Sequence, residues 1–357
     1  MDIEKIDKNF KTAIVNNSEF NYYNPRHAPF VLEGFPFLKK DTAPYCRLPL
    51  ESLSFFSEGL QFLAYHTAGG QIRFCTDSPA IAIKATIGEK SNMNQMPASG
   101  QSSFDCYCGI GKDKKFIGIS IPSVDQTSYN NIIPISGPSA IHEITINFPL
   151  YNSVKEVSIG LHPGAKILLP SPHVLEKPVL FYGSSITQGG CVSRPGNAYC
   201  QIITRWLDAP CINLGCSGHA IGEPEMAKII SSLNLSAFIM DYDHNAPTAE
   251  HLQRTHEPFF KIIRAKNPNL PIILVSAQPQ LSTTAGGIHR KNIIMETYLN
   301  AVHAGDKNIY FIDGNTIFGT SEQDSCTMDC VHPNDLGSMR MAEHIYPILL
   351  QALNTKN

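Results

Sequence analysis

A turn with two adjacent serines carries the first group in the chain that could act as a nucleophile. Ser184 and Ser185 follow the apolar run 179–182, which is bounded by Pro178 and Gly183 and is typical of a buried parallel strand. Open α/β sheets bind their ligands at the carboxyl ends of such strands, where backbone N–H groups can also stabilise an anion. A Gly-Ser-Ser turn alone indicates little, because most such turns only connect elements.

A segment near the C-terminus supplies the partners that a nucleophilic serine needs. Asp329 stands three residues before His332, and Pro333 follows the histidine. A serine is activated by a general base, and the base is oriented by a third group. Asp329 can hold the Nδ1–H group of His332 and direct Nε2 at a hydroxyl, so this pattern favours acyl-transfer chemistry.

Two further segments can add hydrogen-bond donors at the same edge of the sheet. Asn245 follows the apolar run 237–240, and Gly218 lies in the turn 213–218 that comes after the strand 211–212. A side-chain amide and a backbone N–H group at strand ends can both donate to the oxyanion of an acyl-transfer reaction.

Taken in order, the patterns Gly-x-Ser-Ile, Asn-Leu-Gly-x-Ser-Gly, Asn and Asp-x-x-His-Pro resemble the blocks of the SGNH (GDSL-type) hydrolase superfamily. The resemblance covers about residues 176–357, and it is to the subgroup that carries an N-terminal β-sandwich. It implies a serine esterase in which Ser185, His332 and Asp329 form the catalytic triad.

The same resemblance assigns the oxyanion hole. It implies that the N–H groups of Ser185 and Gly218 and the side-chain amide of Asn245 bind the oxyanion. Two positions depart from the usual blocks: Ser184 replaces the aspartate of Gly-Asp-Ser, and Asp243 replaces the glycine of Gly-x-Asn-Asp.

Other charged residues that follow strands have two open interpretations. Arg194, Glu223 and His244 could line a substrate pocket or could only brace the loops that carry them. Asp241, Asp243 and His244 are metal-ligand types, but no distant residue completes such a set. We therefore expect neither a metal nor an organic cofactor.

The second half of the chain alternates between strand-like and helical patterns. This alternation predicts a flavodoxin-like, doubly wound parallel sheet with helices on both faces. The expected strands lie at 179–182, 211–214, 236–241, 271–276 and 308–312, and the expected helices near 197–208, 223–233, 248–266, 289–304 and 335–353.

The first half shows short alternating runs after an irregular stretch over residues 1–45, with a strand-like pattern from about residue 62. Runs of this kind, without helical periods between them, predict an antiparallel, jelly-roll-like β-sandwich. The expected strands lie near 72–75, 80–87, 104–108, 116–121, 143–148 and 154–161.

A boundary between two domains is expected at a proline-rich connection. Pro170 and Pro172 favour an extended linker, so we predict an N-terminal domain over residues 1–173 and a catalytic domain over residues 174–357. The segment 103–107 resembles the Gly-x-Asp-Leu-Tyr motif of the N-terminal domain in the same subgroup.

Composition excludes several classes of protein. The chain has 357 residues, 43% of them hydrophobic, and a net charge of −3. It has no basic run and no apolar stretch of ~18 residues, so we expect no nucleic-acid and no membrane partner. The charged segment 1–8 does not resemble a signal peptide, so we expect a cytoplasmic protein with reduced thiols. The oligomeric state stays open.

The architecture that the resemblance implies is similar to that of carbohydrate acetyl esterases. It suggests hydrolysis of short-chain esters, acetyl esters above all, on a small molecule or an oligosaccharide. Two alternatives stay open. One is an acyltransferase that uses the same Ser185 chemistry with an alcohol in place of water, and the other is a catalytically silent carbohydrate-binding protein.

Overall fold

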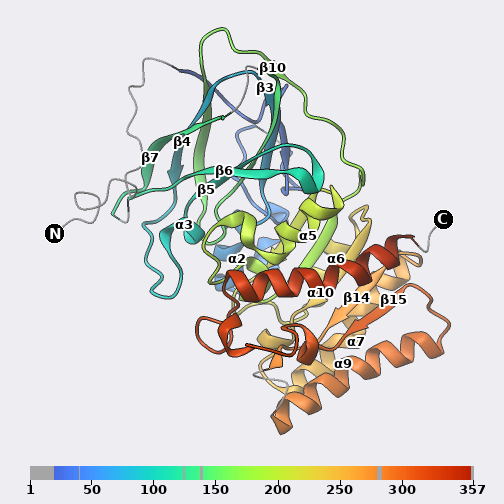
Figure 1. Ribbon diagram of the computed structural model, residues 1–357. Helices are drawn as coiled ribbons and strands as arrows, with labels where there is room; N and C mark the ends of the chain where they lie inside the picture. The colour runs from blue at the N-terminus through green and yellow to red at the C-terminus, as the bar shows by residue number, and fades with distance from the viewer. Residues whose placement is uncertain (1–19, 40, 124, 137–139, 280–283, 355–357) are drawn as a thin grey trace.

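The computed structural model describes residues 20–39, 41–123, 125–136, 140–279 and 284–354. Two antiparallel sheets are formed by the first half of the chain and a parallel sheet by the second half, and Figure 1 shows the antiparallel sheets above the parallel one. Residues 1–8, on which the expectation about the N-terminus rests, lie outside the described residues. Within those residues, no helix has the length and apolar character that a membrane span requires.

The antiparallel sheets pack face to face as a sandwich, as predicted. Their strand orders are β1-β9-β4-β7 and β10-β3-β8-β5-β6, with β2 paired to β3. Alternate apolar residues of both sheets, such as Ile81 and Ile146, share one buried core. The strands are β1 (Asn21–Tyr23), β2 (Val31–Glu33), β3 (Gln71–Thr76), β4 (Ala80–Ile87), β5 (Phe104–Cys108), β6 (Lys115–Ser120), β7 (Ser128–Pro134), β8 (His142–Asn147), β9 (Val154–Leu161) and β10 (Ile167–Leu168).

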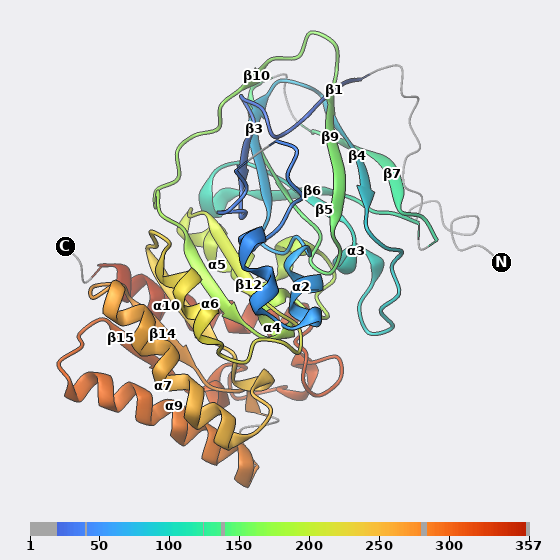
Figure 2. The same ribbon diagram turned by 180° about the vertical axis from the view of Figure 1, so that it is seen from behind.

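A helical segment between β2 and β3 was not predicted. The 3-10 helix η3 (Leu50–Phe55) and helix α2 (Glu58–Ala64) lie mostly before residue 62, where a strand-like pattern was expected to begin, and the last turn of α2 extends into that region. The signal was present, because Ser57 caps α2 by accepting from the Leu60 N–H group. The apolar residues of α2 pack into the core of the parallel sheet rather than the sandwich. Figure 2 shows α2 beside α4 (Ser185–Gln188) and β12 (Cys211–Gly215).

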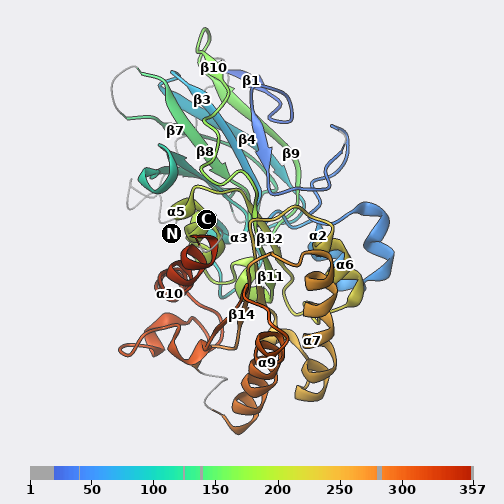
Figure 3. The same ribbon diagram turned by 90° about the vertical axis from the view of Figure 1, so that its right-hand side faces the viewer.

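The parallel sheet has the strand order β12-β11-β13-β14-β15. The chain first adds β12 on one side of β11 and then β13, β14 and β15 on the other side, as in doubly wound folds. Alternate side chains enter two cores: one beneath α2, α6, α7 and α9, the other beneath α5 and α10. Figure 3 shows α5 and α10 on one side of the sheet and α6 and α7 on the other. The remaining bounds are β11 (Val179–Gly183), β13 (Ala237–Asp241), β14 (Ile272–Val275), β15 (Ile309–Ile312), α5 (Tyr199–Leu207), α6 (Pro224–Ser231), α7 (Ala249–Lys266), α9 (Ala285–His303) and α10 (Asp335–Asn354).

Candidate active site

Three neighbouring strands end side by side and bring their loops to one edge of the sheet. Gly183 at the end of β11 is in register with Gly215 of β12 and with Asp241 of β13. A Cβ atom at Gly183 would lie 2.2 Å from the Asp241 carbonyl oxygen, so the close approach of these strand ends requires glycine. The segments that carry Ser185, Gly218 and Asn245 therefore start from the same edge.

Ser185 begins the short helix α4, and its hydroxyl faces the histidine from the C-terminal segment. Ser184 caps the helix, because its Oγ accepts from the Ile186 N–H group at 3.2 Å. Oγ of Ser185 lies 2.8 Å from Nε2 of His332, and Nδ1 of His332 lies 2.7 Å from Oδ2 of Asp329. The structure thus brings together three residues that are separated by up to 147 positions in sequence.

The carboxylate of Asp329 is held in its charged form. Burial by itself would raise its pKa, but hydrogen bonds from the backbone N–H and the ring of His332 outweigh burial and lower the pKa. Oδ1 accepts from the His332 and Val331 N–H groups at 2.7 and 3.1 Å. An ionised Asp329 with both oxygens engaged fixes the orientation of the imidazole ring.

A tight loop between β15 and α10 presents the histidine. The Met328 N–H group donates to the His332 carbonyl at 2.8 Å, and the Asn334 N–H group donates to the Cys326 carbonyl at 3.0 Å. Oδ1 of Asn334 accepts from the Leu336 N–H group and so begins helix α10. Gly190 faces the ring, since a Cβ atom there would lie 3.2 Å from Cδ2 of His332.

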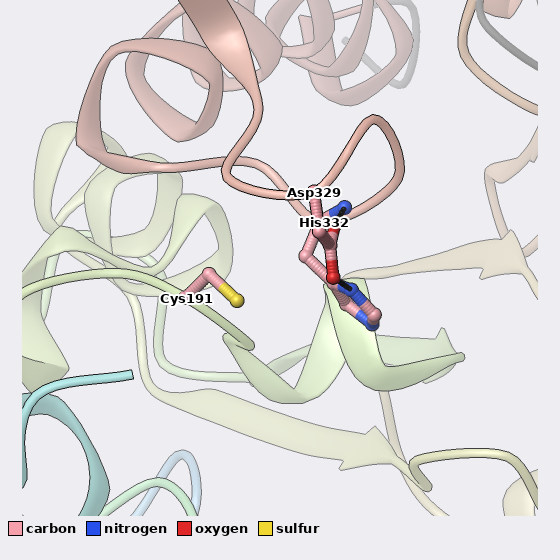
Figure 4. A group of neighbouring side chains, drawn as sticks. All are labelled: Cys191, Asp329 and His332. Atoms are coloured by element: carbon pink, nitrogen blue, oxygen red, sulfur yellow. Dashed lines mark hydrogen bonds and ion pairs between the residues drawn. The ribbon is translucent and has the colours of Figure 1, made fainter. Parts of the chain in front are cut away.

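A buried thiol lies next to the proposed triad. Figure 4 shows the sulfur of Cys191 directed towards Asp329 and His332, and the potential ligand atoms of the three residues lie within 4.8 Å of one another. Burial and the nearby Asp329 raise the pKa of Cys191 to about 11. Both ring nitrogens of His332 are already hydrogen-bonded, to Ser185 and Asp329. A metal ion here would have to replace one of those bonds, and we assign no metal site.

The structure places the two predicted donor residues in the loops that follow β12 and β13. Oδ1 of Asn245 accepts from the Ala220 N–H group at 3.3 Å, which leaves Nδ2 as the donor that can reach an oxyanion. Gly218 has φ of +71°, and no heavy atom lies within 4 Å of the position of an added Cβ. The side of Gly218 where a side chain would project is therefore open.

An arginine that sequence reasoning missed supports the loop that carries Asn245. Nε of Arg290, in α9, lies 2.8 Å from Oδ1 of Asp243, and its guanidinium also donates to the carbonyls of Asp243 and Ala246. The second oxygen of Asp243 accepts from the Ala277 N–H group at 2.9 Å. Asp243 stands where this block usually has glycine, and its carboxylate charge is balanced by the ion pair with Arg290.

Arg194, one of the three residues with two open interpretations, is used at the contact between the two halves of the chain. Its guanidinium lies 2.9 Å from Oδ2 of Asp105, contacts the Tyr107 hydroxyl and stacks 4.0 Å over the Phe116 ring. The Gly196 N–H group donates to the same Asp105 carboxylate at 2.8 Å. These contacts brace the loop of Arg194 against the sandwich. A pocket role for Arg194 stays a prediction.

Glu223 and His244 have different surroundings. The Tyr182 hydroxyl donates to Oε2 of Glu223 at 3.3 Å, so this carboxylate braces the start of α6. Nε2 of His244 is buried and has no hydrogen-bond partner among the described residues. Burial lowers the pKa of His244. A pocket role for these two residues stays a prediction.

The comparisons with known proteins agree with this architecture. The family model of GDSL-like lipases and acylhydrolases matches residues 176–350, and the model of the GxDLY N-terminus of SGNH-hydrolase-type esterases matches residues 20–167. Among curated proteins, no match to the sequence is found. The chain belongs to this family of GDSL-like hydrolases and is an ester-hydrolysing enzyme.

Three solved structures are similar over nearly the whole chain. A Bacteroides ovatus protein assigned as a GDSL-like lipase is 26% identical, with a TM-score of 0.84 over 94% of this chain and 98% of that one. The salicylyl-acyltransferase SsfX3 of a tetracycline biosynthetic pathway is 16% identical, with a TM-score of 0.77 over 95% and 99%. An acetyl xylan esterase of the rumen bacterium Butyrivibrio proteoclasticus is 14% identical, with a TM-score of 0.60 over 94% and 99%.

Proposed function

We propose that the enzyme is a serine esterase that works through an acyl-enzyme on Ser185. Nε2 of His332 accepts the hydroxyl proton while Oγ bonds to the ester carbonyl carbon. The N–H groups of Ser185 and Gly218 and the Asn245 amide bind the oxyanion. The bond to the alcohol then breaks, and the alcohol leaves with the proton from His332. Water attacks the acyl-enzyme in the same way and releases the acid.

The observation that carries this proposal is the chain of two short hydrogen bonds from Ser185 through His332 to Asp329, at 2.8 and 2.7 Å. A base within hydrogen-bond reach of a hydroxyl, oriented by an ionised carboxylate, is the arrangement that activates a serine. Asp329 is ionised at neutral pH, and its lowered pKa keeps it ionised in more acidic solution as well.

The first test removes the nucleophile. We expect Ser185→Ala to lose hydrolysis of p-nitrophenyl acetate and labelling by a fluorophosphonate, because both require Oγ as the attacking atom. The matched control is Ser232→Ala, which removes a hydroxyl at the end of α6 that donates to the Ile229 carbonyl and should keep the label. Hydrolysis by Ser185→Ala at the wild-type rate would refute the scheme.

For the substrate we propose short acyl groups, acetyl in particular, on a sugar or oligosaccharide. Support comes from the two-part architecture, which this chain shares in fold with an acetyl xylan esterase. We expect activity to fall steeply from acetyl to longer p-nitrophenyl esters and acetylated oligosaccharides to release acetate. A preference for octanoyl esters would rule out the acetyl assignment.

Transfer to an alcohol is the second candidate, because the chain also shares its fold with an acyltransferase. Water and an acceptor alcohol would compete for the same acyl-enzyme on Ser185. Product analysis with added alcohols separates the two: a new ester as the main product would indicate transfer, and free acid would indicate hydrolysis.

A further inference from the structure

A loop from the first half of the chain lies against the nucleophile. Residues 149–152 connect β8 to β9, and the Tyr151 hydroxyl donates to the Ser185 carbonyl at 3.0 Å. The side chain of Leu150 packs against the turn after α4, where a Cβ atom at Gly189 would lie 2.8 Å from Cδ1 of Leu150. Leu150 and Tyr151 are both buried. This loop therefore restrains both ends of α4.

The side-chain amide of Gln188 links this loop to the segment that carries Gly218. Nε2 of Gln188 donates to the Leu150 carbonyl at 3.1 Å and lies 3.2 Å from Nδ1 of His66, while Oε1 accepts from the Ser217 N–H group at 3.0 Å. A carbonyl can only accept and a backbone N–H group can only donate, so these partners determine the orientation of the amide. Gln188 is fully buried.

His66 completes the link as an acceptor. Since the Nε2 group of Gln188 donates, Nδ1 of His66 must be the unprotonated nitrogen of a neutral ring. Burial, helped by the charge of Arg47, lowers the pKa of His66 to about 3, so the ring stays neutral throughout the neutral range. The guanidinium of Arg47 itself donates to the Asn213 and Gly215 carbonyls at 2.9 and 2.7 Å, just before the same segment.

These contacts bear on catalysis because oxyanion donors act only when they are held in place before the reaction. Gly218 has positive φ, and no heavy atom lies within 4 Å of the position of an added Cβ, so packing on that side restrains it little. The preceding residue, Ser217, is held through its N–H group by Gln188. The position of the Gly218 N–H group therefore depends on Gln188, and through Gln188 on Leu150 and His66.

We propose that the sandwich half of the chain is part of the catalytic centre: its Tyr151 and His66, together with Gln188 of the second half, act as positioning residues for the oxyanion hole. The proposal rests on the esterase function proposed for Ser185. It assigns the sandwich a role that a separate substrate-binding module would not have: removing these contacts lowers the rate of the chemical step and leaves substrate binding in place.

The test measures kcat and KM for p-nitrophenyl acetate in two full-length variants. Gln188→Met keeps the side-chain volume and removes the three hydrogen bonds, and Tyr151→Phe removes the one to Ser185. We expect kcat to fall about 10- to 100-fold in Gln188→Met and several-fold in Tyr151→Phe, with KM changed less than about threefold. The affinity for a trifluoromethyl ketone, whose adduct carries an oxyanion, should fall in parallel with kcat.

Tyr129→Phe is the matched control. Tyr129 is also buried in the sandwich, and its hydroxyl donates to the Ser102 carbonyl at 2.7 Å. It should lose thermal stability and keep kcat. The proposal is overturned if Gln188→Met and Tyr151→Phe keep the wild-type kcat, or if Tyr129→Phe lowers kcat equally. Failure of the esterase assignment is distinguishable, because Ser185→Ala would then remain active.

Discussion

Individual residues at the end of β13 differ in how their charges are balanced. Asp243 has a guanidinium partner, whereas Asp241 is buried and, among the described residues, accepts hydrogen bonds from the hydroxyls of Tyr199 and Thr187, at 3.0 and 3.2 Å. Burial raises the pKa of Asp241 to about 7, although those hydrogen bonds oppose the shift. The folded protein therefore keeps a proton on Asp241 that the unfolded chain loses at lower pH.

This difference predicts a pH-dependent stability. An aspartate in the unfolded chain has a pKa of about 3.9, so between that value and about 7 the folded state binds more protons, and stability falls as the pH rises. We expect the free energy of unfolding of wild type, relative to Asp241→Asn, to fall by up to ~1.4 kcal/mol per pH unit across this window. Urea denaturation at pH 5, 6 and 7 measures it. If the free energy of unfolding changed with pH equally in wild type and Asp241→Asn, the prediction would be wrong.

At the scale of elements, the strand order brings the loops that follow β11, β12 and β13 to one edge of the sheet. Contacts with neighbouring helices then fix the conformation of these loops. The loop after β13 is held from the side by α9 through the Arg290–Asp243 ion pair, which is almost fully buried. Breaking one partner of a buried ion pair leaves the other charge unpaired and costs about 3–5 kcal/mol. This loop carries Asn245, so breaking the ion pair should displace a donor of the proposed oxyanion hole and also lower the free energy of unfolding.

We predict that Arg290→Met lowers both the melting temperature and kcat, the latter by at least tenfold. The matched control is Arg264→Met, since Nε of Arg264 makes a similar partly buried pair with Asp306 at 2.7 Å, just before β15 at the other edge of the sheet. That variant should lose stability and keep kcat. Kinetics at a temperature where both variants are folded distinguish them, and an unchanged kcat in Arg290→Met would show that the ion pair is only structural.

At the scale of the whole molecule, the two halves are joined by buried polar contacts next to the connection. The ring of His173 lies between two carboxylates: Nε2 is 3.0 Å from Oε2 of Glu33 in β2, and Nδ1 is 2.9 Å from Oδ1 of Asp208 after α5. Arg73 adds a contact of 3.1 Å to Glu33. Residues 46–64 strengthen the join, because they pack in the core of the parallel sheet.

This join should weaken in acid. Burial would raise the pKa of Glu33, but His173 and Arg73 together outweigh burial and lower it. A lowered carboxylate pKa stabilises the fold above the unfolded value of about 4.3, and that stabilisation is lost as the pH falls through the folded value. We expect Glu33→Gln to unfold at a lower temperature than wild type at pH 7 and the difference to shrink below pH ~4.

The control for that measurement is Glu156→Gln, on an exposed position of β9. It should change the melting temperature little at either pH, because a surface carboxylate contributes little to stability. A Glu33→Gln difference that persisted unchanged in acid would show that packing, rather than charge, accounts for the loss.

The sequence by itself determined the strands of the parallel sheet and six strands of the sandwich, but not β1, β2, β7 and β10. The strands of the parallel sheet end within one residue of their predicted positions, because buried apolar runs bounded by glycine or proline are local signals. Ser185, His332 and Asp329 could be named for a similar reason, since each block carries its chemistry in a few adjacent residues.

Only the tertiary structure shows which charged side chains support the loops of the site and which form ion pairs between the two halves of the chain. The pairing of Arg194 with Asp105 joins residues 89 positions apart, and the contact of Gln188 with His66 joins residues 122 positions apart, so no local pattern could predict either. The capping serine of helix α2 is a local signal that the sequence contains. The packing of α2 in the core of the parallel sheet could not be predicted from it. The physical reason is that periodicity and capping act within a few residues, whereas hydrogen bonds between distant segments exist only after the chain has folded.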